Sequence, residues 1–188
     1  SAGNVLKQDM VKKMAAKPII FALANPNPEI TPEDVKAVRD DAIIATGRTD
    51  YPNQVNNVLC FPYIFRGALD CGATTITTSM EIACVYAIAA LAEAEQSEEV
   101  AAAYVGQELS FGPEYLIPKP FDPRLMLIVA PAVAEAAAAA GVAQRPIQDM
   151  DAYREHLKTF VYASGTMMKP IVMAAKKSAR KRVAYAEG

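Results

Sequence analysis

The stretch "PIIFALANPNPEITPEDVKAVRDDAIIATG" (residues 18–47) contains two short apolar runs on either side of a helical pattern. The first run ends at Asn25-Pro26 and the second ends at Gly47. Continuous apolar runs of this length are typical of strands that are buried on both faces. A strand, a helix and a strand in succession predict two parallel strands that are joined by a helical crossover. The stretch therefore predicts an α/β fold.

Helix start signals support this order of elements. Thr31 is the predicted N-cap, Pro32 takes the first helical position, and Asp34 follows the cap by three residues in a capping-box arrangement. Before the first strand, residues 4–16 place apolar side chains near helical spacing, with Asn4 as the candidate cap. We therefore expect one helix before the first strand and another between the two strands.

The chain after Gly47 has the pattern of helices and loops. Pro62 is expected to delay or kink the first of these helices, and either Thr78 or Ser79 is expected to cap the second. Four prolines between residues 110 and 125 predict a loop. The predicted helical segments are 58–72, 78–95, 97–105, 124–142 with its end at Gly141, and 149–162.

Composition and charge exclude several classes of protein. The chain has 188 residues, of which 52% are hydrophobic, and a formal net charge of -2. This charge gives no electrostatic reason to expect binding to nucleic acid or to an anionic membrane. No apolar segment is long enough to span a bilayer, and no signal-peptide pattern is present. The odd number of cysteines, Cys60, Cys71 and Cys84, without metal-ligand spacing indicates buried thiols in a reducing compartment such as the cytoplasm.

The predicted sheet is too small to be complete. Two parallel strands do not bury enough surface to form a stable doubly wound sheet. The nine glycines also contain no G-x-G-x-x-G motif, so the phosphate-binding half of a dinucleotide fold is not encoded here. We therefore expect the chain to be the C-terminal part of a longer α/β protein.

Three asparagines are predicted to meet at the carboxyl ends of the two strands, where open parallel sheets bind ligands. Asn25 follows the first strand, and Asn56 and Asn57 follow the second strand at the start of a helix. An amide can hold a carboxylate, a hydroxyl or a carboxamide without adding charge, and a helix N-terminus favours an anionic ligand. The spacing equally allows a structural role, in which Asn25 forms a turn and Asn56 and Asn57 act as helix caps. Asn53 and Gln54 are expected to shape the loop.

Three other features are assigned modest roles. Arg48 and Asp50 are expected to pair with each other or to orient the loop, and contact between Arg48 and a substrate carboxylate stays an alternative outside the predicted site. His156 is expected to serve a surface or helix-packing role. The basic run at 176–182 is interpreted as a solvated linker rather than a nucleic-acid patch.

The stretch "IIFALANPNPEITPEDVKAVRDDAIIATGRTDYPNQVNNVLCFPYIFRGALD" (residues 19–70) closely resembles bacterial malic enzymes. The resemblance is strongest to the long hybrid type, in which a phosphotransacetylase-like domain follows the malic enzyme region. It continues through "AEQSEEVAAAYVGQELSFGPEYLIPKPFDPRL" (residues 94–125) and "MKPI" (residues 168–171), and so covers essentially the whole chain.

The resemblance implies the following domain organisation. Residues 1–162 correspond to the C-terminal part of a Rossmann-like NAD(P)-binding domain, an α/β domain with a parallel sheet, followed by a largely helical tail. Residues 163–188 correspond to a linker toward the phosphotransacetylase-like domain. The implied partners are the upstream malic enzyme region, that acyltransferase-like domain and further copies in a homo-oligomer.

The implied activity is the oxidative decarboxylation of (S)-malate to pyruvate and CO2, with reduction of NADP or NAD and with Mg or Mn as the assisting metal. The resemblance places the catalytic groups and the metal ligands upstream, so none is assigned in this chain, and the segment alone is expected to be inactive. In the family, the positions of Asn25 and Asn57 contact the substrate and the nicotinamide end of the cofactor. Asn56 is a weaker candidate for cofactor contact.

Two alternatives remain open at this point. The segment could serve mainly as a structural and oligomerisation module with no activity of its own. It could also belong to another nicotinamide-dependent dehydrogenase that acts on a 2-hydroxy acid.

Overall fold

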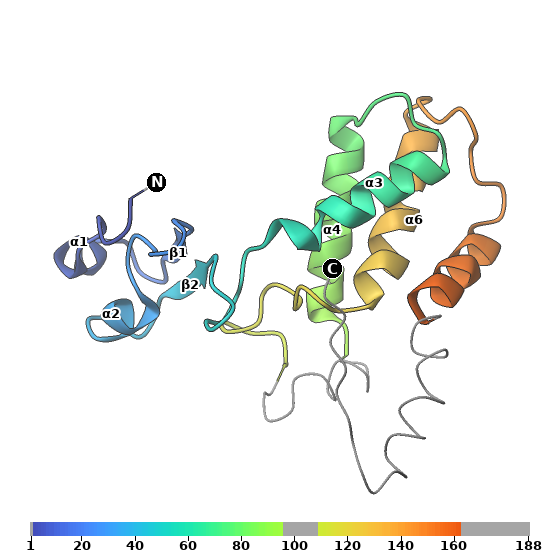
Figure 1. Cartoon of the computed structure of the whole chain (residues 1–188). Helices are drawn as coiled ribbons and strands as arrows, with labels where there is room; N and C mark the ends of the chain where they lie inside the picture. Colours follow the sequence, from blue (N-terminus) through green and yellow to red (C-terminus); the bar gives the residue numbers. More distant parts are fainter. Residues whose placement is uncertain (1, 96–108, 163–188) are drawn as a thin grey trace, which may run out of the picture. The chain divides into compact units, whose positions relative to one another are not determined.

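The computed structural model describes residues 2–95 and 109–162 (Figure 1). The chain divides into two compact units, Ser1–Gln148 and Asp149–Gly188. The described part of the second unit is a helix over residues 150–162, as expected, and His156 on it is exposed. The predicted helix at 97–105 and the predicted linker lie outside the described residues.

The predicted parallel strand pair is confirmed. Strand β1 (Ile19–Ala22) pairs in parallel with β2 (Ile43–Thr46), with Ile19 opposite Ile43 and Ala22 opposite Thr46. Helix α1 (Gln8–Lys12) precedes β1, and α2 (Pro32–Lys36) lies between the strands in the sequence. The order helix, strand, helix, strand is therefore the one that the sequence predicts.

Of the two predicted N-caps, the cap of α2 is confirmed and the cap of α1 is wrong. The predicted cap of α2 is confirmed, because the Thr31 hydroxyl accepts from the Asp34 N–H at 3.2 Å and donates to the Asp34 carboxylate at 2.9 Å. The predicted cap of the first helix is wrong: Lys7 precedes α1, whereas Asn4 has a φ of 60° and its N–H donates to the Pro28 carbonyl at 2.9 Å. The first residues pair with the turn after β1, so α1 is shorter than the apolar spacing indicates.

Strand β1 buries one of its faces within the part of the chain that the structure describes, whereas β2 also buries Ala45, which lies opposite Phe21. The side chains of Ile20 and Ala22 point into the core, whereas Ile19 and Phe21 are 59% and 60% exposed. The expectation that the first strand is buried on both faces is therefore not met here. The reason is that α1 and α2 both pack on the same face. The buried members of this core are Val11, Ile20, Ala22, Ile30, Val35 and Ile44.

A guanidinium group fastens α1 to the segment before β2. Arg39 donates to both carboxylate oxygens of Asp41, at 2.6 and 2.8 Å. It also donates to the carbonyls of Val11 at 2.9 Å and Ala15 at 3.0 Å, near the end of α1. The Lys17 N–H donates to Asp41 at 2.7 Å. The bond from Arg39, followed by that from Lys17, holds the pKa of the Asp41 carboxyl well below its ordinary range.

The second half of the first unit is helical, as expected. A 3-10 turn, η1 (Asn57–Leu59), leads into α3 (Phe61–Asp70), and α4 (Thr78–Glu93) and α6 (Arg124–Ala139) follow. Helix α6 packs against both α3 and α4 (Figure 1).

Most of the predicted start and end signals of these helices are confirmed. Pro62 lies in the first turn of α3 and delays the start of that helix, because proline fits there and not further in. Gly141, which has a φ of 69°, follows the end of α6 as predicted. The cap of α4 is Thr77, one residue before the earlier of the two expected caps, and its hydroxyl accepts from the Met80 N–H at 3.4 Å. The proline-rich segment that precedes α6 is a loop, as predicted.

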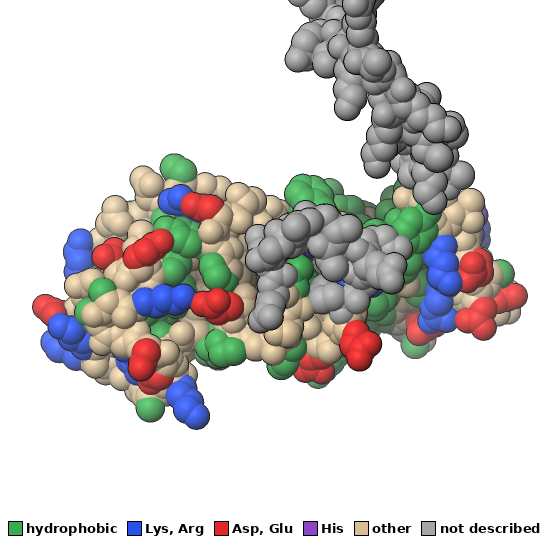
Figure 2. Space-filling view, turned by 90° about the horizontal axis from the view of Figure 1, so that it is seen from below, with side chains coloured by type: hydrophobic (Ala, Val, Ile, Leu, Met, Phe, Trp, Pro, Cys, Tyr) green, Lys and Arg blue, Asp and Glu red, His purple; other side chains and the backbone are tan. Residues whose placement is uncertain are grey.

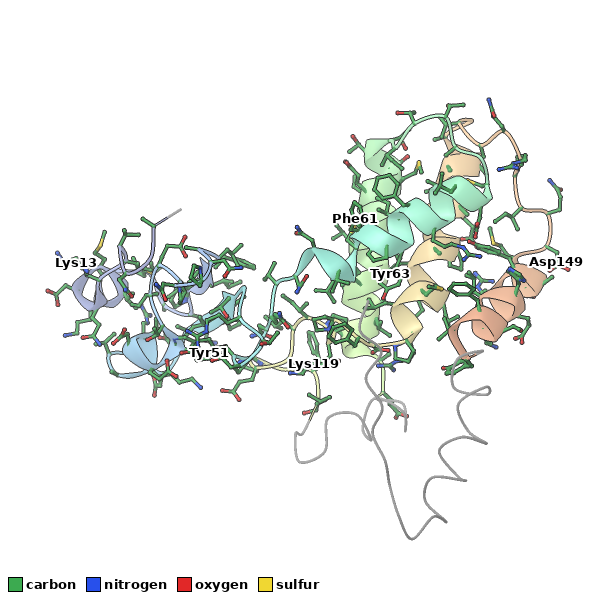
Figure 3. All side chains as sticks on the ribbon, viewed as in Figure 1. Lys13, Tyr51, Phe61, Tyr63, Lys119 and Asp149 are labelled. Carbon is green, nitrogen blue, oxygen red and sulfur yellow. The ribbon has the colours of Figure 1, made fainter. Side chains whose placement is uncertain are left out.

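Helix α3 presents aromatic side chains both outward and inward. Phe61 and Tyr63, marked in Figure 3, differ in burial: Phe61 is exposed, whereas Tyr63 is half-buried and burial raises its pKa. Together with Phe65 and Leu69, Phe61 forms an exposed apolar stripe along this helix. On the face seen in Figure 2, by contrast, acidic and basic side chains are interspersed, so this face carries no extended field of one sign. Within the described ranges, no helix is both long and apolar enough to cross a bilayer.

Close contact between α3 and α6 requires a glycine. A Cβ atom at Gly67 would lie 2.4 Å from the Ala130 carbonyl oxygen and 3.0 Å from the Val133 Cβ. The backbone of α3 therefore approaches α6 at a distance that no other residue allows.

One buried amide joins β2 to the proline-rich loop. Asn53 is 4% exposed and has a φ of 52°. Its Nδ2 donates to the Ile44 carbonyl at 3.0 Å and to the Pro113 carbonyl at 2.7 Å, and its Oδ1 accepts from the Leu116 N–H at 2.8 Å. The prediction that Asn53 shapes the loop is confirmed, and the side chain also spans two segments that are distant in the sequence.

We expect Asn53→Asp to lower the free energy of unfolding by at least about 2 kcal/mol, because two buried carbonyls then face a carboxylate instead of a donor. Aspartate keeps the shape of the side chain and tolerates the positive φ. Urea unfolding of both proteins measures the difference. The matched control is Gln54→Glu, whose side chain makes no hydrogen bond to a described residue and which should cost less than about 0.5 kcal/mol. Equal stability of Asn53→Asp and the wild type would contradict this role.

We expect Gly67→Ala to destabilise the chain by about 1–3 kcal/mol, because the added methyl group overlaps the backbone of α6. Gly112→Ala is the control, since the nearest atom to its Cβ is the Ser110 carbonyl oxygen at 3.9 Å. Thermal unfolding followed by circular dichroism compares the two variants. A Gly67→Ala protein that melts with the wild type would show that the helices move apart at little cost.

The Asp41 carboxyl has a pKa below its ordinary value of 3.8 in the folded chain, so its stabilisation is complete above that value and is lost as the pH falls through the folded pKa. We therefore expect the free energy of unfolding to fall on acidification, and to fall less in Asp41→Asn. Urea titrations across the acid range measure this slope. An Asp41→Asn protein whose stability falls as steeply on acidification as that of the wild type would contradict this role of the carboxylate.

Candidate functional site

A cavity of about 570 Å³ opens at the carboxyl ends of β1 and β2. It is formed by the turn that follows β1 and by the loop that follows β2. This is the edge of a parallel sheet at which ligands bind in α/β proteins. The described residues that line it are Asn25, Pro26, Asn27, Gly47, Arg48, Thr49, Asp50, Gln54 and Asn56.

A carboxylate holds the turn that carries Asn25. The Ala24 N–H donates to the Glu29 carboxylate at 3.0 Å, and this bond lowers the pKa of Glu29. The Leu6 N–H also donates to the Glu29 carbonyl at 3.0 Å. Asn25 is exposed between these anchored positions, so its amide is available to a ligand. Sequence reasoning missed Glu29; an acid in a turn that contains two prolines was the available signal.

The structure brings two of the three predicted asparagines to the cavity. Asn25 and Asn56 both line it, whereas Asn57 lies next to Asn56 as the first residue of η1 and is not among the lining residues. Asn56 caps η1, because its Oδ1 accepts from the Val58 N–H at 3.0 Å. The cap reading is therefore correct for Asn56, and its amide nitrogen remains as a donor.

The expected helix terminus at Asn57 is reduced to a single 3-10 turn. Regular helix begins four residues later, at Phe61, because Pro62 cannot donate a backbone hydrogen bond further into a helix. The helix dipole therefore contributes less at Asn57 than the sequence predicts.

A charged network follows β2. Arg48 donates to both oxygens of Asp50, at 2.8 and 2.5 Å, which confirms the predicted pair. The Arg48 guanidinium also lies 4.9 Å from the centre of the Tyr51 ring, and the Tyr51 hydroxyl donates to the Glu33 carboxylate at 3.0 Å. The hydrogen bonds of this pair raise the pKa of Arg48 and lower the pKa of Asp50. Arg48 is therefore a permanent cation at the rim of the cavity.

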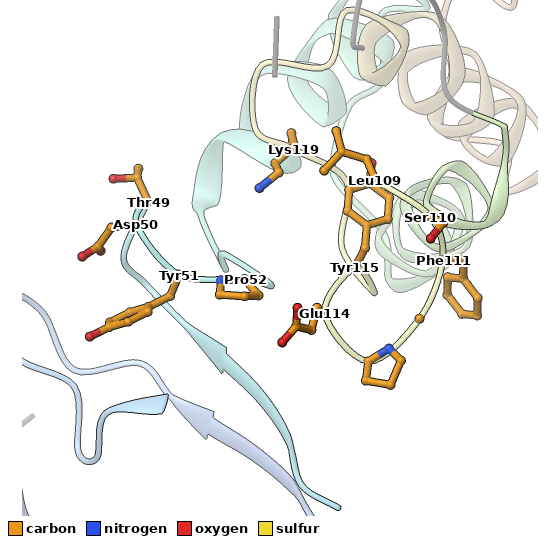
Figure 4. A pocket seen from close by; sticks show the side chains of 12 residues that line it. Thr49, Asp50, Tyr51, Pro52, Leu109, Ser110, Phe111, Glu114, Tyr115 and Lys119 are labelled. Carbon is orange, nitrogen blue, oxygen red and sulfur yellow. The ribbon is translucent and has the colours of Figure 1, made fainter. Parts of the chain in front are cut away.

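A second cavity, of about 640 Å³, lies between the loop at residues 49–52 and the proline-rich loop (Figure 4). Tyr115 and Lys119 line it, and burial lowers the pKa of Lys119. The Tyr115 hydroxyl is buried and makes no hydrogen bond to any described residue. This cavity contains none of the three predicted asparagines.

The cysteines are free thiols, and two of the three are buried as expected. Cys71 and Cys84 are buried, and Cys60 is half-buried with its Sγ 3.2 Å from the Sγ of Cys84. Burial, followed by the contact with Cys60, raises the pKa of the Cys84 thiol to about 12. Among the described residues, no three side chains of histidine, cysteine, aspartate or glutamate form a group that could hold a metal ion. The side chains in these described ranges therefore do not by themselves form a site for the divalent metal that the resemblance implies.

Comparison with known proteins identifies the family. Residues 1–104 match the family model described as malic enzyme, NAD binding domain. The chain is 64% identical over its full length to the NADP-dependent malic enzyme of Haemophilus influenzae, and 61% identical to the NAD-dependent malic enzyme of Rhizobium meliloti. It spans 25% and 24% of those two proteins, respectively.

A solved structure gives the same assignment. The malic enzyme from Pyrococcus horikoshii Ot3 matches with a TM-score of 0.72 and 41% identity, over 92% of this chain and 36% of that one. Since a family model matches more than half of the chain, and since the sequence and structure matches agree with it, the chain belongs to the malic enzyme family and contains sequence of its NAD-binding domain.

Proposed function

We propose that this chain is part of an enzyme that converts (S)-malate to pyruvate and CO2 while NADP or NAD is reduced. The observation that carries the proposal is the cavity at the carboxyl ends of β1 and β2, in a chain of the malic enzyme family, with Asn25 and Asn56 on its lining. The chain covers about a quarter of its curated relatives, and we propose that the rest of the enzyme supplies the catalytic groups and the Mg or Mn ligands.

In this proposal, the asparagines bind and orient the substrate and the nicotinamide. The nicotinamide cofactor, when bound, accepts the hydride that leaves C2 of malate. The amide of Asn25 donates to a substrate oxygen, and the free Nδ2 of Asn56 donates to the carboxamide or to the substrate. Asn57 keeps its proposed substrate and cofactor contacts on the resemblance alone. Neutral amides suit this task, because they fix a charged hydroxy acid without competing for its protons.

The remaining organisation is also a proposal. Residues 1–162 form the C-terminal part of a Rossmann-like domain with a helical tail, and residues 163–188 lead toward a phosphotransacetylase-like domain of a hybrid malic enzyme. The uncovered face of β1, with Ile19 and Phe21, supports contact with an upstream region that packs on this face. The free thiols support a cytoplasmic location.

A second candidate role, in subunit assembly, is supported by exposed apolar side chains on two neighbouring helices. The stripe of α3 is exposed along its length, and α4 exposes Val85 and Tyr86 at 64% and 72%. Apolar patches of this kind mark protein interfaces. A homo-oligomer that buries them is compatible with the enzymatic role.

In the full-length enzyme, we expect Asn25→Ala and Asn57→Ala each to lower kcat/KM for malate by about tenfold or more, through loss of positioned hydrogen bonds. Initial rates of cofactor reduction measure the effect. Gln148→Ala removes an amide that donates only locally, to the Pro146 carbonyl among the described residues, and should leave the rates unchanged.

The same variants separate the two roles. If the chain serves assembly alone, the asparagine variants alter oligomeric mass or stability while the activity of each site stays intact. Wild-type kinetics in both variants would refute the proposed substrate contacts.

A further inference from the structure

Arg48 is held in one place by three independent contacts. Its backbone N–H donates to the hydroxyl of Thr46, a fully buried residue of β2, at 3.2 Å. Its guanidinium is fixed at one edge by Asp50 and at one face by the Tyr51 ring. Tyr51 is in turn anchored to Glu33. Because the guanidinium is held at one edge and on one face, the side chain loses little further entropy when it binds a ligand.

The guanidinium retains binding capacity. An arginine carries five N–H donors, and the two bonds to Asp50 use one at Nε and one at Nη2. The side chain is 39% exposed, so the remaining donors are accessible. An aspartate that orients one edge of a guanidinium leaves another edge free for a second carboxylate.

The position of Arg48 defines the ligand. Arg48 and Asp50 are the charged side chains among the described residues that line the cavity with Asn25 and Asn56. Malate has two carboxylates, and a neutral amide suits the one next to the reacting carbon. We propose that Arg48 binds a carboxylate of a dicarboxylic 2-hydroxy acid and so determines specificity for dicarboxylates over monocarboxylates. This inference rests on the proposed function.

A carboxylate fits this position better than a phosphate group of the cofactor. Asp50 offsets most of the charge of Arg48, and its own charge repels a phosphate that carries nearly two negative charges. The alternative is testable, because loss of a phosphate contact would raise the KM for NADP, whereas loss of a carboxylate contact raises the KM for malate.

The experiment uses the full-length enzyme with Arg48→Ala and Arg48→Lys. We expect Arg48→Ala to raise the KM for malate by about tenfold, the effect of losing a charge-assisted hydrogen bond, while the KM for the cofactor stays unchanged. We expect Arg48→Lys to bind malate more tightly than Arg48→Ala does, because lysine retains the positive charge but lacks the paired N–H donors of the guanidinium. Inhibition by succinate should weaken in Arg48→Ala, whereas inhibition by butanoate, which has one carboxylate, should not change.

Chemical rescue distinguishes binding from a merely structural role. Dilute guanidinium should lower the KM of Arg48→Ala for malate, whereas the same concentration of urea, which is neutral and similar in shape, should not. Arg154→Ala is the matched control, since Arg154 is 42% exposed and also pairs with an aspartate, Asp151, at 3.2 Å. It should behave as the wild type.

The outcomes separate this inference from the proposed function. A wild-type enzyme that does not oxidise malate would overturn the proposed function. An active wild type with an unchanged KM for malate in both Arg48 variants would overturn only the role of Arg48. A raised KM for NADP with an unchanged KM for malate would also overturn it, because Arg48 would then bind phosphate.

Discussion

The carboxamide of Asn53 makes hydrogen bonds to three backbone groups in two segments that no local structure would bring together. It donates to β2 and to the proline-rich loop and accepts from that loop, so its buried polar atoms are satisfied. The chain returns to β2 directly afterwards, where the Val55 N–H donates to the Thr46 carbonyl at 2.8 Å. Residues 47–54 therefore form a loop with a closed base, and this closure determines where Arg48 and Asn56 lie.

The chain buries its apolar surface unevenly. One face of the two-stranded sheet has a well-defined core, whereas the opposite face leaves Ile19 and Phe21 exposed. Helix α4 is apolar on nearly all sides, and such helices are typically surrounded by protein. Since the chain spans about a quarter of its curated relatives, these surfaces support the proposal that further regions of the enzyme cover them.

Local signals predicted the elements with unequal success. Thr31 and Pro62 acted as expected, because a cap and a first-turn proline depend only on their immediate neighbours. Asn4 failed as a cap because the chain around it pairs with the turn after β1, which lies more than 20 residues away. Among the candidate site residues, the sequence pattern brought Asn25 and Asn56 to one cavity, but it overestimated the helix at Asn57.

The sequence by itself determined the α/β class, the parallel order of the two strands, the helical second half and the resemblance to malic enzymes. These depend on apolar periodicity, caps and quoted motifs, all of which are local in the chain. Only the tertiary structure decided that Asn53 is a buried clamp, that Gly67 lies against α6, and that Arg48 shares a cavity with Asn25. Hydrogen bonds and packing between distant segments determine these positions, and such contacts leave no periodic trace in the sequence.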